Sequence, residues 1–125
     1  MFELPSFLQR YLDQEFERLA QERPQARQEL QQAVAQLSQR YLQGPSAAGH
    51  LSGSLTILAY LSARLPATYA AGAAVLRQLS QVLPDWQPRH GIDLGAGPGS
   101  ISLATQPFFR PAQYLLYEAD TRMIQ

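Results

Sequence analysis

The segment Asp93-Leu-Gly-Ala-Gly-Pro-Gly-Ser100 joins an aspartate to a turn that contains three glycines. It follows a short apolar run, His90 to Leu94, and precedes a run that can begin a helix. Glycines in such a turn let a ligand approach the backbone closely, because no side chain intervenes. The segment therefore predicts a small-molecule site at a strand-to-helix turn, with a carboxylate beside it.

Three ligand classes use turns of this kind, and the residues separate them. The nucleoside-triphosphate loop requires a lysine, and the chain contains none. The dinucleotide fingerprint is G-x-G-x-x-G, whereas the spacing here is Gly95-x-Gly97-x-Gly99, one residue shorter. Pro98 also lacks the amide donor that a pyrophosphate would need. A nucleoside ligand without phosphates, such as S-adenosylmethionine, fits better, and a nucleotide-dependent oxidoreductase is the less favoured alternative.

S-adenosylmethionine carries an ammonium and a sulfonium, which favour a nearby carboxylate such as that of Asp93. Its ribose hydroxyls need an acceptor on the adjacent strand. Glu118 follows Gly95 by close to the roughly 20 residues typical of ribose recognition in nucleotide folds. Asp120 is the second choice, because it lies past the predicted strand. The predicted cofactor-binding residues are Asp93, Gly95, Ala96, Gly97, Gly99 and Glu118.

Helices are expected in the first two thirds of the chain. Apolar residues recur at helical spacing after Pro5, and again between Pro24 and Gly44. The glutamine-rich second stretch is interpreted as a solvated helix, followed by a loop over 44–53. A third helix is expected to end near Pro66 and a fourth to run from Pro66 to Pro84, because proline disfavours a helix interior.

The last third changes character and predicts a strand–helix–strand unit. The expected strands are His90 to Leu94 and Tyr114 to Glu118, with a short helix over Ser100 to Gln106. Such a unit requires parallel strands. The continuous apolar run from Tyr114 to Tyr117 is typical of a parallel strand buried on both faces. An unpaired apolar edge would be an aggregation liability.

Composition excludes several kinds of function. The chain has 125 residues and a formal net charge of +0. It contains no cysteine, so disulfides and thiolate chemistry are excluded. The arginines are scattered, and no dense basic run predicts nucleic-acid binding. His50 and His90 have no partners at metal-ligand spacing, so no metal is expected. No signal peptide or membrane span is expected, which favours a cytoplasmic protein.

The glycine turn resembles the first motif of class I S-adenosylmethionine-dependent methyltransferases, and Glu118 matches the acid that this superfamily uses on ribose. The run Ala59-Tyr-Leu-Ser-Ala-Arg-Leu-Pro-Ala-Thr-Tyr-Ala-Ala71, then Leu83-Pro-Asp-Trp-Gln-Pro88, resembles the methyltransferase-like family of the small ribosomal subunit. This family comprises the mitochondrial assembly factor and its bacterial relatives.

The resemblance implies S-adenosylmethionine-dependent methyl transfer, or a binding role, on the small ribosomal subunit or its rRNA. A non-catalytic assembly factor that keeps the cofactor fold is the alternative. The resemblance also implies that four upstream residues line the cofactor pocket, although the two tyrosines among them could instead be core residues. These four are Tyr60, Arg64, Thr68 and Tyr69. Trp86 is interpreted as a packing anchor, with stacking on RNA as the less favoured alternative.

We therefore expect an α/β protein: a helical N-terminal module over residues 1–83, then the first βαβ unit of a Rossmann-like methyltransferase fold over 84–125. The family's members continue well beyond the position that matches Gln125. We accordingly expect an incomplete domain with no catalytic residue of its own, and a chain inactive in methyl transfer by itself.

Overall fold

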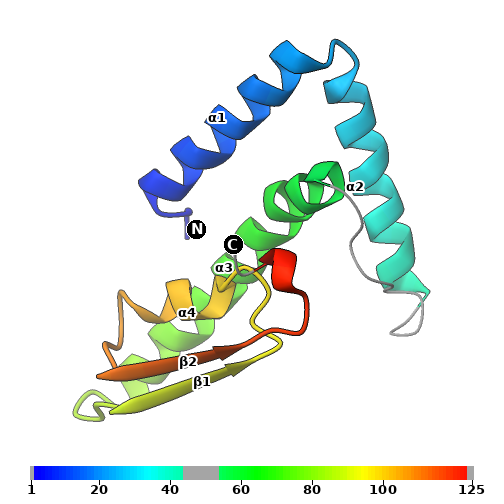
Figure 1. Ribbon diagram of the computed structural model, residues 1–125. Coiled ribbons are helices and arrows are strands. Elements are labelled where there is room, and N and C mark those ends of the chain that lie inside the picture. The colour runs from blue at the N-terminus through cyan, green and yellow to red at the C-terminus, as the bar shows by residue number, and fades with distance from the viewer. Residues whose placement is uncertain (1, 44–53, 124–125) are drawn as a thin grey trace. The chain divides into compact units, whose positions relative to one another are not determined.

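The computed structural model describes residues 2–43 and 54–123. The elements follow one another as three helices, α1 (Ser6–Glu22), α2 (Ala26–Leu42) and α3 (Ser54–Val82), and then a strand–helix–strand unit (Figure 1). That unit consists of β1 (His90–Leu94), α4 (Ser100–Thr105) and β2 (Gln113–Tyr117), with a short 3₁₀ turn at Thr121–Met123. The chain divides into two compact units, Pro5–Arg64 and Met1–Leu4 with Leu65–Gln125. The division into 1–83 and 84–125 stays a prediction.

The unit Pro5–Arg64 contains α1, α2 and the first part of α3. Helix α1 begins directly after Pro5 and buries Leu12. Helix α2 buries Ala26, Leu30 and Leu37, while its glutamines are exposed, so the prediction of a solvated helix is confirmed. The predicted loop over 44–53 lies outside the described residues.

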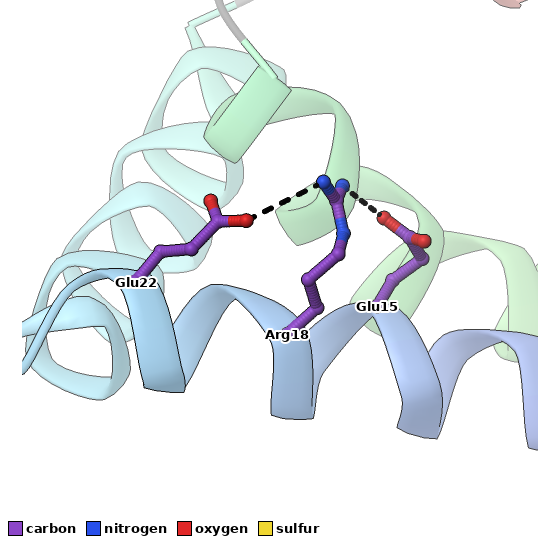
Figure 2. Close-up of polar contacts among 3 residues, drawn as sticks. All are labelled: Glu15, Arg18 and Glu22. Carbon is purple, nitrogen blue, oxygen red and sulfur yellow. Dashed lines mark hydrogen bonds and ion pairs between the residues drawn. The ribbon is translucent and has the colours of Figure 1, made fainter.

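Helix α1 carries a small charged network on the side that borders the first part of α3. The Arg18 guanidinium contacts Glu15 at 2.6 Å and Glu22 at 3.7 Å, one helical turn away on each side (Figure 2). Residues three and four apart on a helix are neighbours, which brings these charges together. The hydrogen bond to Glu15 is the main reason that the pKa of Arg18 is raised. Because Arg18 is solvent-exposed, this network is a surface feature that adds little to stability.

The expectation of two helices separated at Pro66 is wrong, because α3 is one continuous helix with Pro66 inside it. An interior proline costs about 3 kcal/mol. Leu65 and Tyr69 lie one turn apart and are only 1% and 5% exposed. Burying one such side chain contributes about 1.5–3 kcal/mol, so the pair offsets the proline. A continuous helix is what places both residues on the buried side.

The second compact unit is built on the parallel pair β1–β2, as predicted from the βαβ pattern. Figure 1 shows α4 and the C-terminal part of α3 along one face of the two strands. Tyr69, Ala73 and Ala104 form the buried cluster between these helices. The helices approach closely at Gly72, where an added Cβ would lie 2.6 Å from Ile101 Cδ1. The α/β class is therefore confirmed as helices with a small parallel sheet.

Burial of both faces of the strands, expected from their apolar sequence, is not observed. The residues paired in register on one face are all exposed: Ile92 63%, Leu94 77%, Leu115 40% and Tyr117 57%. The reason is that both packed helices lie on the other face, so no described element covers this one. No helix within the described residues is long and apolar enough to cross a membrane.

Candidate functional site

The glycine turn lies between the end of β1 and the start of α4, and its three glycines all have positive φ. The angles are 69° at Gly95, 54° at Gly97 and 82° at Gly99. At Gly95 an added Cβ would meet no atom within 4 Å, so glycine is required there by conformation and not by space. A side chain disfavours this region of φ, which explains why a turn of this shape is glycine-rich.

The end of β2 holds the turn through its backbone. The carbonyl of Tyr117 accepts hydrogen bonds from the amides of Gly95, at 2.8 Å, and Ala96, at 3.0 Å. Sequence reasoning did not identify Tyr117 as a turn residue, because a backbone carbonyl leaves no mark in residue type. The parallel register, which pairs Leu94 with Tyr117, is what places this carbonyl opposite the turn.

Glu118 lies directly after β2 and closes the turn with its side chain. One carboxylate oxygen, Oε2, accepts the amide hydrogen of Gly97 at 2.6 Å. The other, Oε1, accepts the amide hydrogen of Asp120 at 2.8 Å. The structure therefore brings together Gly95, Ala96, Gly97 and Glu118, which the sequence predicted to share one site. Asp120, the second choice for ribose, supports Glu118 through its backbone.

Asp93 points toward α4 from the end of β1. Its carboxylate receives a hydrogen bond from the backbone amide of Ser102, in the first turn of that helix. Gly99 occupies the N-cap of that helix and has no side chain to offer. The role of Ser102 was not predicted, since the contact is made by its backbone.

One oxygen of Asp93 stays unsatisfied. Oδ2 is buried and has no hydrogen-bond partner among the residues that the structure describes. The pKa of Asp93 is raised above its ordinary value, first by burial and then by the negative charge of Glu118, while the Ser102 amide opposes this. A buried carboxylate oxygen without a donor favours a cation or a hydrogen-bond donor from a ligand.

A pocket of about 620 Å³ adjoins the turn on the side of α4. It runs from Pro98 and Gly99 past Ser102 and Thr105 to Arg110, and Tyr114 and Leu116 of β2 form its floor. The ring of Tyr114 covers Gly91, its partner in register, where a Cβ would lie 2.8 Å from ring atoms. The volume of the pocket is in the range of small-ligand pockets.

The assignment of four upstream residues to a cofactor pocket, which rests on the resemblance, stays a prediction. Tyr69 is a core residue packed with Ala73 and Ala104, as the core interpretation allowed. Tyr60 and Arg64 belong to the other compact unit. Trp86 contacts Phe109 edge to face, with ring centroids 5.3 Å apart, in agreement with a packing anchor.

Residues 2–43 and 54–123 contain no group of three His, Asp or Glu side chains placed to hold a metal ion. His90 begins β1 and is exposed, and His50 lies outside the described residues.

Comparison with known proteins gives one family. The model of the family described as mitochondrial small ribosomal subunit Rsm22 matches residues 54–123, more than half of the chain. The match extends from the start of α3 to the 3₁₀ turn and includes every element of the glycine site. No curated protein matches the chain.

Proposed function

The chain belongs to the family described as mitochondrial small ribosomal subunit Rsm22, and from this premise we propose two linked functions. The protein acts in association with the small ribosomal subunit, and its glycine turn binds S-adenosylmethionine in the manner of a class I methyltransferase domain. The observation that carries the second function is the contact of the Glu118 carboxylate with the Gly97 amide, which joins the two predicted halves of one site.

The hydrogen bonding of the turn favours a ligand without phosphates. The amides of Gly95 and Ala96 donate hydrogen bonds to the Tyr117 carbonyl, and the amide of Gly97 donates to the Glu118 carboxylate. The Gly99 amide donates a hydrogen bond to the Ala96 carbonyl at 2.9 Å, and Pro98 has no amide hydrogen. A dinucleotide needs free amides in this turn to hold its pyrophosphate. With none free between 95 and 99, a nucleoside ligand is favoured over NAD.

The two carboxylates match the two polar ends of S-adenosylmethionine. Each oxygen of Glu118 accepts one hydrogen bond here and keeps a further lone pair, so the pair can accept from ribose hydroxyls. The unsatisfied Oδ2 of Asp93 can accept from the ammonium of the methionine part. When bound, the cofactor supplies an electrophilic methyl group on its sulfonium.

Calorimetric titration tests the choice of ligand. S-adenosylmethionine and its demethylated product are expected to bind more tightly than NAD. Glu118→Gln replaces one acceptor oxygen by an amide NH2 group. That group is a donor, so it cannot accept the hydrogen bond from the amide of Gly97 or Asp120. We expect it to weaken cofactor binding by about 1.5–3 kcal/mol. Asp85→Asn, an exposed acid in the same compact unit, is the control and is expected to bind like the parent. Tighter binding of NAD would overturn the assignment.

The family description names a subunit and no reaction. A scaffold that binds the cofactor without methyl transfer is therefore the second candidate. Transfer of label from S-adenosylmethionine to small ribosomal subunits, measured on a protein that also carries the downstream segment of the family's members, separates the two: labelling that depends on Glu118 supports the enzyme. Cofactor binding and association with the subunit, without labelling, support the scaffold.

A further inference from the structure

The amino ends of β1 and β2 bring together two segments that are separate in sequence. The amide of Gln113 donates to the carbonyl of Arg89 at 3.2 Å, and Trp86 contacts Phe109 edge to face. Figure 1 shows these amino ends side by side, at the end of the strands opposite the glycine turn. The surface formed by residues 86–90 and 109–113, here called the amino edge, lies at the other end of the strands from the glycine turn and shares Arg110 with the far end of the pocket described above.

The amino edge is basic. Arg89 and Arg110 come one from each segment, both are exposed, and neither has an ion-pair partner in the described part of the chain. On α1 and in the turn before α2, by contrast, Arg18 and Arg23 are paired with glutamates. The two segments contain no acid, and Asp85 is the nearest one in sequence. Two cations held by a hydrogen-bonded backbone therefore face solvent uncompensated.

An aromatic ring accompanies these charges. Trp86 is 47% exposed, although its ring contacts that of Phe109, which is only 3% exposed. A ring anchored on one side and open on another is a surface on which a base can stack. Phosphate contacts from arginine combined with stacking on an aromatic ring are the usual means of holding single-stranded nucleic acid.

We infer that the amino edge binds single-stranded RNA, with Arg89 and Arg110 on the phosphates and Trp86 stacked on a base. The inference rests on the proposed association with the small ribosomal subunit and specifies both its chemical partner and the surface that meets it. A protein partner is less favoured, because an exposed tryptophan on the same surface as two arginines without ion-pair partners matches a chain of alternating phosphates and bases.

The single tryptophan of the chain makes the test direct, since tryptophan emission, excited selectively over that of the tyrosines, reports on Trp86 alone. The full chain is titrated with oligouridylate of about twelve nucleotides, within the span that small single-strand binding modules occupy. Quenching is expected with oligouridylate and not with an abasic strand of the same length, because only bases can stack. Binding without any change in tryptophan emission would overturn the stacking role.

The arginines are tested by charge-matched variants. Arg89→Gln with Arg110→Gln is expected to weaken binding at least tenfold, and to lower the slope of log K against log salt by about 1.4, for two lost phosphate contacts at about 0.7 each. Arg10→Gln with Arg27→Gln removes two exposed charges from the other compact unit and is expected to bind like the parent. Equal loss in both pairs would show non-specific attraction and overturn the inference.

Sedimentation with small ribosomal subunits separates this inference from the function on which it rests. Loss of cosedimentation in the Arg89/Arg110 pair, but not in the control pair, supports the RNA edge. If the parent and both pairs cosediment equally, association with the subunit stands and the amino edge is not its RNA contact. If the parent does not cosediment but still binds oligouridylate through this edge, the subunit association fails while the RNA site stands.

Discussion

Two acids of the glycine site differ in how their oxygens are satisfied. Glu118 has a backbone amide on each oxygen, so its charge is supported by hydrogen bonds. Asp93 has the Ser102 amide on one side and a buried oxygen without a donor on the other. Glu118 therefore holds the turn closed through its hydrogen bond with Gly97, and it is also a candidate acceptor for ribose hydroxyls. Asp93 carries an unsatisfied charge in the absence of a ligand.

This difference predicts a pH dependence of stability. The folded pKa of Asp93 is raised, so the folded chain holds this proton more tightly than the unfolded chain. The contribution to the free energy of unfolding is fully present below the ordinary aspartate pKa. It is lost as pH rises through the raised folded value. In Asp93→Asn this loss is absent, so the variant gains on the parent as pH rises through and above the ordinary aspartate pKa.

Urea unfolding across that pH range measures the difference. Asp85→Asn is the matched control, because Asp85 is an exposed aspartate of the same compact unit. The asparagine introduced in place of Asp93 also changes stability by a constant amount, since its amide has other hydrogen-bond needs. The readout is consequently the slope with pH and not the offset. Parallel profiles for parent and variant would contradict the role given to Asp93.

At the scale of elements, the contact between α3 and α4 organises the second compact unit. Ala73 and Ala104 are both 0% exposed, and Gly72 lies against Ile101. Small residues on the two helices let them approach closely. The packing of α4, which follows the glycine turn, thus depends on side-chain volume in α3.

Two nearby alanines of α3 provide a test of this packing. Ala73→Leu adds volume where none is free, and is expected to destabilise the protein by about 1–3 kcal/mol. Ala71→Leu makes the same change at an exposed position of the same helix, and a change within about 0.5 kcal/mol is expected. Thermal unfolding of the two variants measures this difference. Similar losses in both would show that the α3–α4 interface tolerates larger residues.

At the scale of the whole molecule, one face of the sheet distinguishes this chain from a closed α/β layer. Ile92, Leu94, Leu115 and Tyr117 form a continuous exposed apolar surface, uncovered within the described residues. The chain carries no net charge to oppose association. Exposed apolar surface next to free strand edges favours self-association.

We therefore expect the average mass of the protein to rise with concentration. Ile92→Thr with Leu94→Thr should suppress this rise, because threonine keeps the preference for a strand while making the surface polar. Val75→Thr with Val82→Thr changes two exposed apolar residues of α3 and serves as the control. Sedimentation velocity over a range of concentrations measures the effect. Unchanged association in the strand variant would show that another surface is responsible.

Local signals in the sequence were sufficient for most elements and for the grouping of the site. Pro5 and apolar periodicity predicted α1, and the apolar run before the glycines predicted β1 with the bounds that the structure has. The second strand and the short helix shifted by only one residue at their ends. These features depend on neighbouring residues alone, and the parallel pairing follows from the helical crossover between the strands.

Other features were decided by contacts that no local pattern encodes. Pro66 lies inside a helix because Leu65 and Tyr69 gain more from burial than the proline costs. Tyr69 lies in the core, and the apolar residues of the strands are exposed on the face that no helix covers. The sequence by itself determined which residues belong to the turn. Only the tertiary structure decided which amides and oxygens are still free there, because backbone groups of Tyr117 and Ser102 use or supply them through the sheet and helix packing.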